Sequence, residues 1–431
     1  MKPRFLLFLI ATLFIANVAM SQQRDLQYWR PYDQRGINVF ETTKTDSTAF
    51  TDQRVRIGAN FTQQFQGLRH STKAEPNIVN EVNLNALKPI GNGFNLATAN
   101  LIIDAQLEDG IRVHLSTYLS SRHHQETWVK GGYIQFDKLS FLKSPIIDKI
   151  MEDVTLRIGH MEINYGDAHF RRSDNGNALY NPFVENLIMD AFTTEIGGEV
   201  YFQKKGFLVM GSVTGGEIKG DVTQPEKRSP AYIGKVGYDR QLTRDLRVRL
   251  TGSVYGKEKS VSNTLYSGDR TGSRYYFVME NVNASLTSQF TSGRFSPGYS
   301  NKVTAFVVNP FVKIKGLEVF GNLEWASGRA GSESVNRNTA QYSAEAIYRF
   351  PANSERFFIG GRYNTIESTL PGADQTKINI NRTQASGGWF VTRNILAKVE
   401  YVNQQYKGFV SSDIRHGGEF HGVMFEAVLG F

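Results

Sequence analysis

Apolar and polar residues alternate along most of the chain, in segments of about ten residues that are separated by turn-forming stretches. In the segment 246–255, Leu246, Val248 and Leu250 alternate with Arg247 and Arg249. Successive side chains of a β-strand point to opposite sides, so this alternation predicts strands with one apolar and one polar face. The same pattern recurs in segments 54–65, 317–325, 344–350 and 397–401.

The connections between these segments are alternately short and long. We expect short turns at residues 108–110, 204–205, 241–245, 315–316, 351–355 and 391–394. We expect long loops at residues 66–93, 165–192, 216–230, 257–299, 327–339, 367–377 and 407–416. This arrangement is typical of an outer-membrane barrel, whose short turns face the periplasm. Residues 138–153 are an exception, because they form a long connection on the predicted periplasmic side.

The fold class that follows is all-β, a transmembrane antiparallel β-barrel. In a soluble sandwich the polar face would meet bulk water, whereas in a wide barrel it lines an aqueous lumen. The strand count depends on two apolar stretches, 78–87 and 275–290. Placing both inside outer loops gives sixteen strands, and counting both as barrel strands gives eighteen. We prefer sixteen, because that count keeps the long loops on one side.

The last segment of the sequence alternates in the same way. Phe425, Leu429 and Phe431 fall on one apolar face, opposite smaller or polar residues. This predicts the closing strand of a barrel, and the terminal aromatic pattern resembles the signal read by the bacterial barrel-assembly machinery. The alternative interpretation is the final strand of a soluble sheet.

The first residues predict a secretory signal peptide over 1–21. Lys2 and Arg4 precede an apolar run over residues 5–15, and small residues at Ala19 and Ser21 come before the expected cleavage site, which follows Ser21. The run is shorter than the roughly 20 residues that a membrane-spanning helix needs. Residues 22–53 then form a periplasmic segment or a plug inside the lumen, and residues 54–431 form the barrel.

Composition supports this picture and excludes several classes of protein. Aromatic residues make up 12% of the 431 residues, as expected where aromatic side chains mark two membrane interfaces. The absence of cysteine excludes disulfides and thiolate metal sites. The formal net charge of +8 comes from scattered residues, so we expect no nucleic acid partner.

Three motifs resemble the porin superfamily, and specifically the phosphate-selective porin O and P type of Gram-negative bacteria. Residues 94–96 lead to Leu107-Glu108-Asp109-Gly110-Ile111 as in the opening strand–turn–strand of that family. Residues 156–161 resemble the strand that enters its long third loop, and residues 25–31 resemble porin-like proteins of Bacteroidota. The resemblance implies a sixteen-stranded barrel, often a trimer, that passes small solutes. The arginine ladder of the phosphate-selective members has no residue-by-residue match in this chain.

The segment 165–192 holds the densest set of candidate site residues. In general porins the third loop folds inward, and opposed charges at the constriction set selectivity. Asp167, Arg171, Arg172 and Asp174 are suitable groups here, and the alternative is a solvated outer loop. Asp167 and His169 suggest a catalytic dyad, but no Ser or Cys nucleophile lies in a recognisable elbow. We therefore predict neither an enzyme nor a metal or cofactor site.

The polar faces of the predicted strands carry charges of both signs. The candidate lumen-lining residues are Arg54, Arg56, Arg112, Arg157, Arg247, Arg249, Glu318, Glu324, Glu345, Arg349, Lys398 and Glu400. In a wide, wet lumen these charges would interact weakly and be screened over about 8 Å. A change such as Arg249→Leu would then be tolerated for folding.

These observations predict an outer-membrane, porin-like channel for passive diffusion of small hydrophilic solutes, with a weak preference for anions. The expected partners are outer-membrane lipid, the barrel-assembly machinery, small hydrophilic or anionic solutes and other copies of the chain in a homotrimer. The alternative is a non-conducting barrel that serves as scaffold in a secretion, adhesion or uptake complex.

Overall fold

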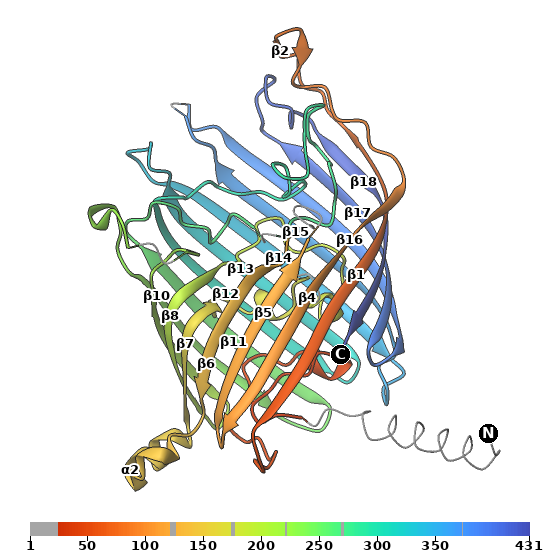
Figure 1. The fold of residues 1–431 in the computed structure, drawn as a ribbon. Coiled ribbons are helices and arrows are strands. Elements are labelled where there is room, and N and C mark those ends of the chain that lie inside the picture. The colour runs from red at the N-terminus through yellow and green to blue at the C-terminus, as the bar shows by residue number, and fades with distance from the viewer. Residues whose placement is uncertain (1–24, 121–125, 174–176, 220–221, 269–270, 373) are drawn as a thin grey trace, which may run out of the picture.

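Sixteen antiparallel strands close into one barrel in the computed structural model (Figure 1). The structure describes residues 25–120, 126–173, 177–219, 222–268, 271–372 and 374–431. The barrel strands are β1 (Arg54–Ser71), β4 (Gly93–Glu108), β5 (Ile111–Leu119), β6 (Trp128–Phe136), β7 (Val154–Glu162), β8 (Thr194–Lys204), β9 (Phe207–Thr214), β10 (Ala231–Gln241), β11 (Leu246–Lys257), β12 (Lys302–Ile314), β13 (Leu317–Arg329), β14 (Arg337–Phe350), β15 (Phe357–Thr369), β16 (Lys377–Thr392), β17 (Ile395–Lys407) and β18 (Glu419–Gly430). Each strand pairs with its neighbours in sequence, and β1 closes the barrel by pairing with both β4 and β18.

The predicted fold class and the preferred count of sixteen strands are confirmed. The stretch 78–87 contributes only the small hairpin of β2 (Ile78–Val79) and β3 (Val82–Asn83), which projects from the long-loop end (Figure 1). The stretch 275–290 lies in the loop between β11 and β12 and contributes no strand. The predicted signal peptide, residues 1–21, lies outside the described residues.

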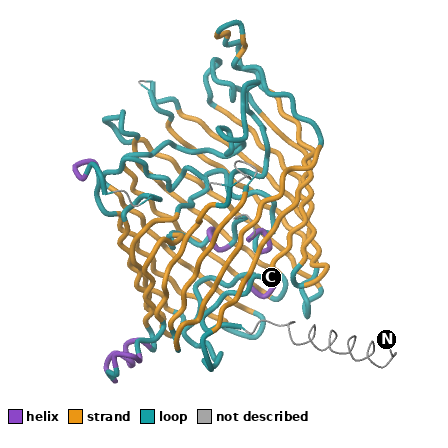
Figure 2. Tube along the Cα trace, in the orientation of Figure 1, coloured by secondary structure: helices purple, strands orange, loops and turns teal. Residues whose placement is uncertain are grey.

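Helical structure is short and lies between the strands (Figure 2). The connection 138–153 contains η2 (Ser140–Leu142) and α2 (Pro145–Met151) at the short-turn end. The other 3₁₀ turns are η1 (Gln34–Gly36), η3 (Ala168–Phe170), η4 (Asn177–Leu179) and η5 (Pro225–Lys227). Within the part of the chain that the structure describes, no helix is both long enough and apolar enough to cross a membrane.

The alternation seen in the sequence separates the two faces of the barrel wall. On β11, Leu250 is 55% exposed on the outside, whereas the neighbouring Arg249 is 4% exposed on the inside. Apolar side chains on the outer faces of other strands are exposed in the same way, including Val209, Val319 and Ile359. A closed barrel satisfies its backbone hydrogen bonds internally, so this apolar outer wall is suited to contact with lipid.

The inside of the barrel is filled at three levels (Figure 1). Residues 25–53, the N-terminal segment, lie toward the short-turn end, and the described part of residues 163–193, the inner loop, crosses the middle. The described part of residues 258–301, the outer loop, covers the long-loop end. Inner-loop residues Val184, Ile188 and Met189 are fully buried and form part of an apolar core inside the lumen. The expectation of a wide, wet lumen is therefore wrong, because these segments occupy the space that water would fill.

Candidate functional site

The inner loop is held to the barrel wall by Arg171. Its Nε and Nη2 atoms donate to Oε1 of Glu345 on β14, at 3.1 and 2.8 Å. Arg362 on β15 donates to the other oxygen of Glu345, with Nη2 at 2.9 Å. The Arg171 guanidinium also lies 3.7 Å from Glu318 on β13. All four side chains are buried, so their charges compensate one another inside the protein.

A second set of ion pairs joins the inner loop to the outer loop. Arg172 pairs with Asp190 at 2.5 Å, and both residues belong to the inner loop. Arg294 of the outer loop pairs with Asp190 at 2.8 Å and with Glu185 at 2.7 Å. Burial would raise the pKa of the Glu185 carboxyl, but the nearby arginines lower it to about 2, so the carboxylate is charged and paired.

Asp167 lies at the start of the inner loop and joins it to β10 and β11. Its carboxylate accepts hydrogen bonds from Arg249 at 2.7 Å and lies 2.8 Å from Nζ of Lys235. Burial would raise its pKa, but these two cations lower it to about 2. His169 faces elsewhere, with Nε2 at 3.0 Å from Asn164 and Nδ1 at 3.3 Å from Glu162. Asp167 and His169 therefore have different partners, and the geometry does not make them a dyad.

The N-terminal segment lies in the lumen, where it bonds to inward-facing residues of the wall. Tyr32 donates its hydroxyl hydrogen to Asp104 on β4 at 2.7 Å. The Asn38 amide donates to Glu318 at 2.6 Å. Further along, Glu41 accepts a hydrogen bond from Arg249 at 2.7 Å. The sequence allows either a tail in the periplasm or a plug inside the lumen. These contacts correspond to a segment inside the lumen.

The structure places the candidate lumen charges on the inner side of the wall. Several of them form ion pairs, which are Arg54–Asp52, Arg112–Asp104, Arg247–Asp239, Arg349–Glu318 and Lys398–Glu426. Others contact aromatic side chains, which are Arg56 over Trp29, Arg157 over Tyr133, Glu324 with Tyr266 and Glu400 with Tyr275. Most of these groups are buried against the segments that fill the lumen. The candidate lumen charges therefore form close contacts with their partners, in place of the weak, screened interactions expected in a wet lumen.

The described constriction candidates lie inside the barrel, whereas the assembly candidates lie on its outer face. Of the four predicted constriction residues, Asp167, Arg171 and Arg172 are buried in the inner loop, and Asp174 lies outside the described residues. The proposed assembly residues, which are Phe425, Leu429 and Phe431, are exposed on the outer face of the wall. Their role in assembly stays a prediction.

A cavity of about 190 Å³, here called the side cavity, remains between the inner loop and the wall formed by β4 to β8. Its charged lining residues are predominantly basic. Its ionisable lining residues are Arg30, Tyr32, Arg112, His114, Lys130, Tyr133, Arg157, His160, Glu162 and His169. Arg171 and Arg172 line a smaller space on the other side of the inner loop, of about 30 Å³. A solute in the side cavity would therefore meet basic side chains other than Arg171 and Arg172, the pair that the sequence predicts at the constriction.

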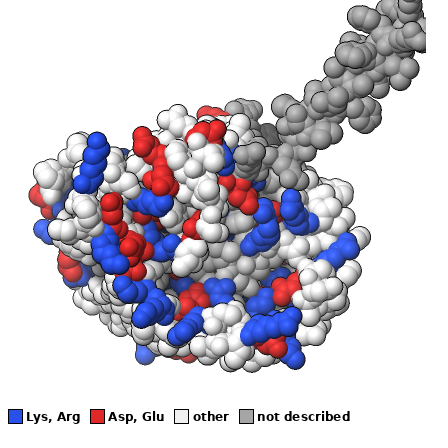
Figure 3. Space-filling view, turned by 90° about the horizontal axis from the view of Figure 1, so that it is seen from below, with Lys and Arg blue, Asp and Glu red and all other residues white. Residues whose placement is uncertain are grey.

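A second space, here called the vestibule, opens at the short-turn end and has a volume of about 480 Å³. Its charged lining residues are Glu41, Lys44, Lys204, Lys205, Asp239, Arg240, Arg247 and Arg249. Basic side chains are prominent at this end of the molecule, with acidic ones among them (Figure 3). Phe40 and Thr42 line the side cavity, whereas Glu41 and Thr43 line the vestibule. The N-terminal segment therefore separates the two spaces.

Several residues that line the interior could not be predicted as lumen residues from the sequence. Arg30, Glu41 and Lys130 have no periodic signal that marks them as inward-facing lumen residues. Arg30 and Glu41 lie in a segment without strand alternation, and Lys130 follows two exposed residues, Trp128 and Val129, at an irregular point of the β5–β6 pairing. Over the described ranges, no group of three or more His, Cys, Asp or Glu side chains is placed to hold a metal ion.

Comparison with known proteins identifies the fold. No protein-family model matches the chain, and no curated protein matches it in sequence. OprB of Pseudomonas putida is similar in structure, with a TM-score of 0.52 and 9% identity over 88% of this chain and 94% of that chain. An anion-selective porin from Comamonas acidovorans has a TM-score of 0.50 and 8% identity over 88% of this chain and 100% of that chain. The outer-membrane channel DcaP of Acinetobacter baumannii has a TM-score of 0.50 and 10% identity over 88% of this chain and 98% of that chain.

At these identities the comparison shows a shared fold, the sixteen-stranded barrel of outer-membrane porins and channels. The closed barrel and its apolar outer wall indicate that the chain lies in an outer membrane, in contact with lipid.

Proposed function

We propose that this chain is a narrow, porin-like channel of the outer membrane, through which small hydrophilic anions diffuse by way of the side cavity. The observation that carries the proposal is the charge of that cavity. Arg30, Arg112, Lys130 and Arg157 line it, against one carboxylate, Glu162. Rings and clusters of one sign of charge at a constriction favour permeating ions of the opposite sign.

Partial burial strengthens this effect. Arg112 is compensated by Asp104 at 2.8 Å, but Arg157 lies 3.9 Å from its nearest carboxylate partner, Glu199. Lys130 lies over the Phe192 ring at 5.5 Å. In an interior of low dielectric constant, a charge acts on a passing ion far more strongly than it would in bulk water. We place the anion preference at Lys130 and Arg157 rather than at Arg171 and Arg172, because the first two line the side cavity and the other two do not.

The size of the side cavity limits the solute. At about 30 Å³ per water molecule, a cavity of 190 Å³ holds roughly six waters. This suits a small hydrated anion and excludes a sugar chain or a peptide. Inorganic phosphate and short carboxylates are the solutes to test first, and phosphate is also suggested by the resemblance to phosphate-selective porins.

The N-terminal segment acts as a plug in this proposal. It separates the side cavity from the vestibule through residues 40–43. A solute that passes from one space to the other requires this segment to move. Residues 25–48 are tied to the wall through Asp104, Arg249 and Glu318, so their movement would expose buried charges and be infrequent. We expect brief openings and a small mean conductance.

Recordings in planar lipid bilayers test the proposal. The wild-type chain should show small channels whose reversal potential in a KCl gradient indicates anion preference. Lys130→Gln with Arg157→Gln should shift the reversal potential toward that of cations, and deletion of residues 25–48 should raise conductance several-fold. The matched control is Lys227→Gln with Lys259→Gln, because both lysines are exposed in outer loops and neither lines the side cavity. An unchanged reversal potential in the first variant would refute the assignment of selectivity to the side cavity.

A second candidate function, a non-conducting scaffold in a secretion, adhesion or uptake complex, is favoured by the filling of the lumen at three levels. The deletion of residues 25–48 distinguishes the two. A scaffold has no route behind the plug, so both wild type and deletion variant would be silent in the bilayer. A plugged channel would conduct once the plug is removed. We further propose that the barrel is inserted by the assembly machinery, forms a homotrimer and catalyses no reaction.

A further inference from the structure

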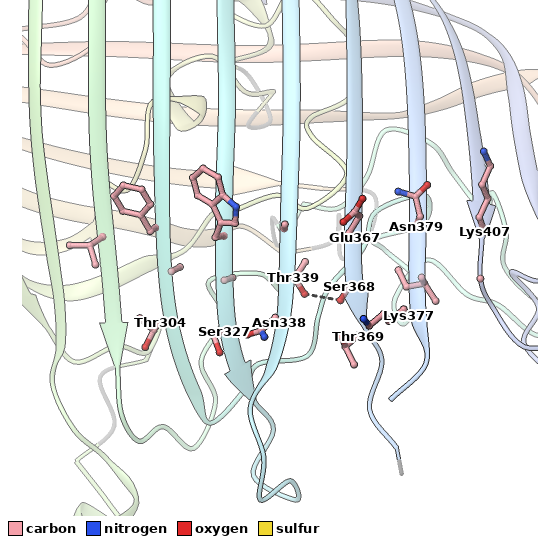
Figure 4. A pocket seen from close by; sticks show the side chains of 18 residues that line it. Thr304, Ser327, Asn338, Thr339, Glu367, Ser368, Thr369, Lys377, Asn379 and Lys407 are labelled. Atoms are coloured by element: carbon pink, nitrogen blue, oxygen red, sulfur yellow. Dashed lines mark hydrogen bonds between the residues drawn. The ribbon is translucent and has the colours of Figure 1, made fainter. Parts of the chain in front are cut away.

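A large concave site lies on the outside of the barrel wall. It is a groove of about 880 Å³ that crosses the outer faces of β11 to β17 near the long-loop end (Figure 4). The outward-facing side chains that line it are Val254, Thr304, Phe306, Trp325, Ser327, Asn338, Ala340, Glu367, Thr369, Lys377, Asn379 and Lys407. A barrel wall is ordinarily convex toward lipid, so a concave region of this size distinguishes this side of the barrel.

The floor of the groove on β11 to β13, in the register row of Phe306 and Trp325, is apolar. Val254, Phe306 and Trp325 are 45%, 46% and 40% exposed. The Phe306 and Trp325 rings stack with centroids 5.9 Å apart. The Trp325 indole donates a hydrogen bond to the hydroxyl of Tyr342 at 3.0 Å. Tryptophan and tyrosine with one apolar and one polar side are typical of the membrane–water interface, so this floor lies at acyl-chain depth just below the head groups.

The part of the groove on β15 to β17 is polar and carries two lysines. Lys407 on β17 is in register with Asn379 on β16, which is in register with Glu367 on β15. Lys377 lies two residues from Asn379 on the same outer face of β16, and both lysines are exposed. Neither lysine forms an ion pair with another residue in the described ranges. Two ammonium groups that form no ion pair, beside hydrogen-bonding side chains and the single carboxylate of Glu367, form a site that fits a phosphorylated, hydroxyl-rich group.

We infer that this groove binds a phosphorylated glycolipid of the outer leaflet. Its phosphate lies against Lys377 and Lys407, its sugar hydroxyls bond to Ser327, Asn338, Asn379 and Thr369, and its acyl chains cover Phe306 and Trp325. Polar side chains continue the register row of Trp325 across β15 to β17 as far as Lys407, and a second polar row that includes Ser327 and Lys377 lies two residues nearer the long loops. The groove is continuous with the lipid-exposed wall. Glu367 lies among the polar groups, where it accepts hydrogen bonds from hydroxyls and opposes a phosphate.

Native mass spectrometry of the purified full chain in detergent, titrated with diphosphorylated lipid A, tests the inference. The wild type should retain one tightly bound lipid. Each Lys near a membrane surface contributes about 1 kcal/mol toward anionic lipid, so Lys377→Gln with Lys407→Gln should weaken binding about 10- to 30-fold. Glu367→Gln removes a like charge and should strengthen binding a few-fold. Weaker lipid binding in the lysine variant together with stronger binding in Glu367→Gln would indicate a phosphate site, because a general loss of folding would weaken binding in both variants.

The control is again Lys227→Gln with Lys259→Gln, which removes two exposed basic charges outside the groove and should leave the affinity unchanged. Heat-modifiable migration on gels reports whether each variant forms a barrel. Equal lipid affinity in wild type and in the Lys377/Lys407 variant would overturn the inference. Dissociation of an oligomer in that variant would also overturn it, because the groove would then be covered by a second copy of the chain. The result does not depend on conductance, so it stands apart from the proposed channel function.

Discussion

Arg171 of the inner loop binds Glu345 of β14 through two atoms of its guanidinium, and the two residues are 174 positions apart in the sequence. This pair fixes the middle of the loop against the wall. Glu345 is shared with Arg362, and a buried cluster of this kind is costly to break, because the remaining charges are left without compensation. The position of the inner loop is therefore determined by a few buried ion pairs as well as by its apolar core.

Glu345→Gln should destabilise the barrel. The neutral side chain leaves Arg171 and Arg362 buried with only part of their compensation, and breaking a buried pair in this way costs about 3–5 kcal/mol. Urea unfolding in lipid vesicles, followed by tryptophan fluorescence, measures the change. Glu152→Gln is the control, because the Glu152–Lys149 pair is exposed at the short-turn end and its loss should leave the unfolding curve unchanged. Equal curves for wild type and Glu345→Gln would show that the pair does not hold the loop.

Arg171→Ala with Arg172→Ala should loosen the inner loop and alter permeation. The change leaves Glu345, Glu318 and Asp190 with fewer cations, so the interior becomes more negative. We expect a higher conductance and a reversal potential shifted toward cations in a salt gradient. The shift should be smaller than for Lys130→Gln with Arg157→Gln, because Arg171 and Arg172 do not line the side cavity. The reverse order would move the selectivity site to the inner loop.

Arg249→Leu and Leu250→Arg should both reduce folding, for different reasons. The sequence alone predicts that the loss of Arg249 is tolerated, but Arg249 contacts Asp167 and Glu41, each at 2.7 Å, so in this filled lumen we expect its loss to destabilise the fold. Leu250→Arg places a charge on the lipid face, at a cost of roughly 2–4 kcal/mol near the bilayer midplane.

The pH dependence of unfolding distinguishes these two variants. Without Arg249 the buried carboxylates lose a cation, and the resulting penalty exists only while they are charged in the folded state. It should shrink as the pH falls from 7 toward the ordinary carboxyl pKa of about 4. The penalty of Leu250→Arg should be constant over the same range, since arginine stays charged. Parallel pH profiles for the two variants would contradict the inward position of Arg249.

Glu280 should make the outer loop sensitive to pH. Burial raises the pKa of its carboxyl to about 7, although the hydroxyl of Ser292, at 3.0 Å, and the charge of Arg415 lower it. In the unfolded chain the pKa is about 4.3. As the pH rises from about 4 to 7, the Glu280 carboxyl ionises in the unfolded chain but stays protonated in the folded loop. The stability of the folded loop therefore decreases over this range, and the loss of stability is complete above it.

Hydrogen exchange of loop 258–301, corrected for intrinsic rates, should therefore be faster at pH 8 than at pH 6. Glu280→Gln should abolish the difference, because the amide does not titrate. Glu333→Gln in the neighbouring long loop should preserve it, since the pKa of Glu333 is lowered by Arg337 and lies outside this range. A difference that persists in Glu280→Gln would assign the pH response to another group.

The wall of the barrel could be predicted from the sequence, because its determinants are local. The alternation of Leu250 with Arg249, repeated strand by strand, fixes the two faces, and the lengths of the turns fix the direction of each strand. The interior could not be predicted in the same way. The partners Arg171 and Glu345, or Glu41 and Arg249, lie 174 and 208 positions apart, and no local pattern specifies which loop folds inward.

The partners of the N-terminal segment lie far along the chain, since Glu41 binds Arg249 and Asn38 binds Glu318, 208 and 280 positions away. Contacts of such separation form only after the strands that carry them have joined the barrel. Residues 25–48 precede all sixteen strands in sequence and yet must dock after most of them. Folding order is thus the reverse of chain order at this point. We therefore expect each newly closed barrel to pass through an interval in which the short-turn end of its lumen is open, until residues 25–48 dock.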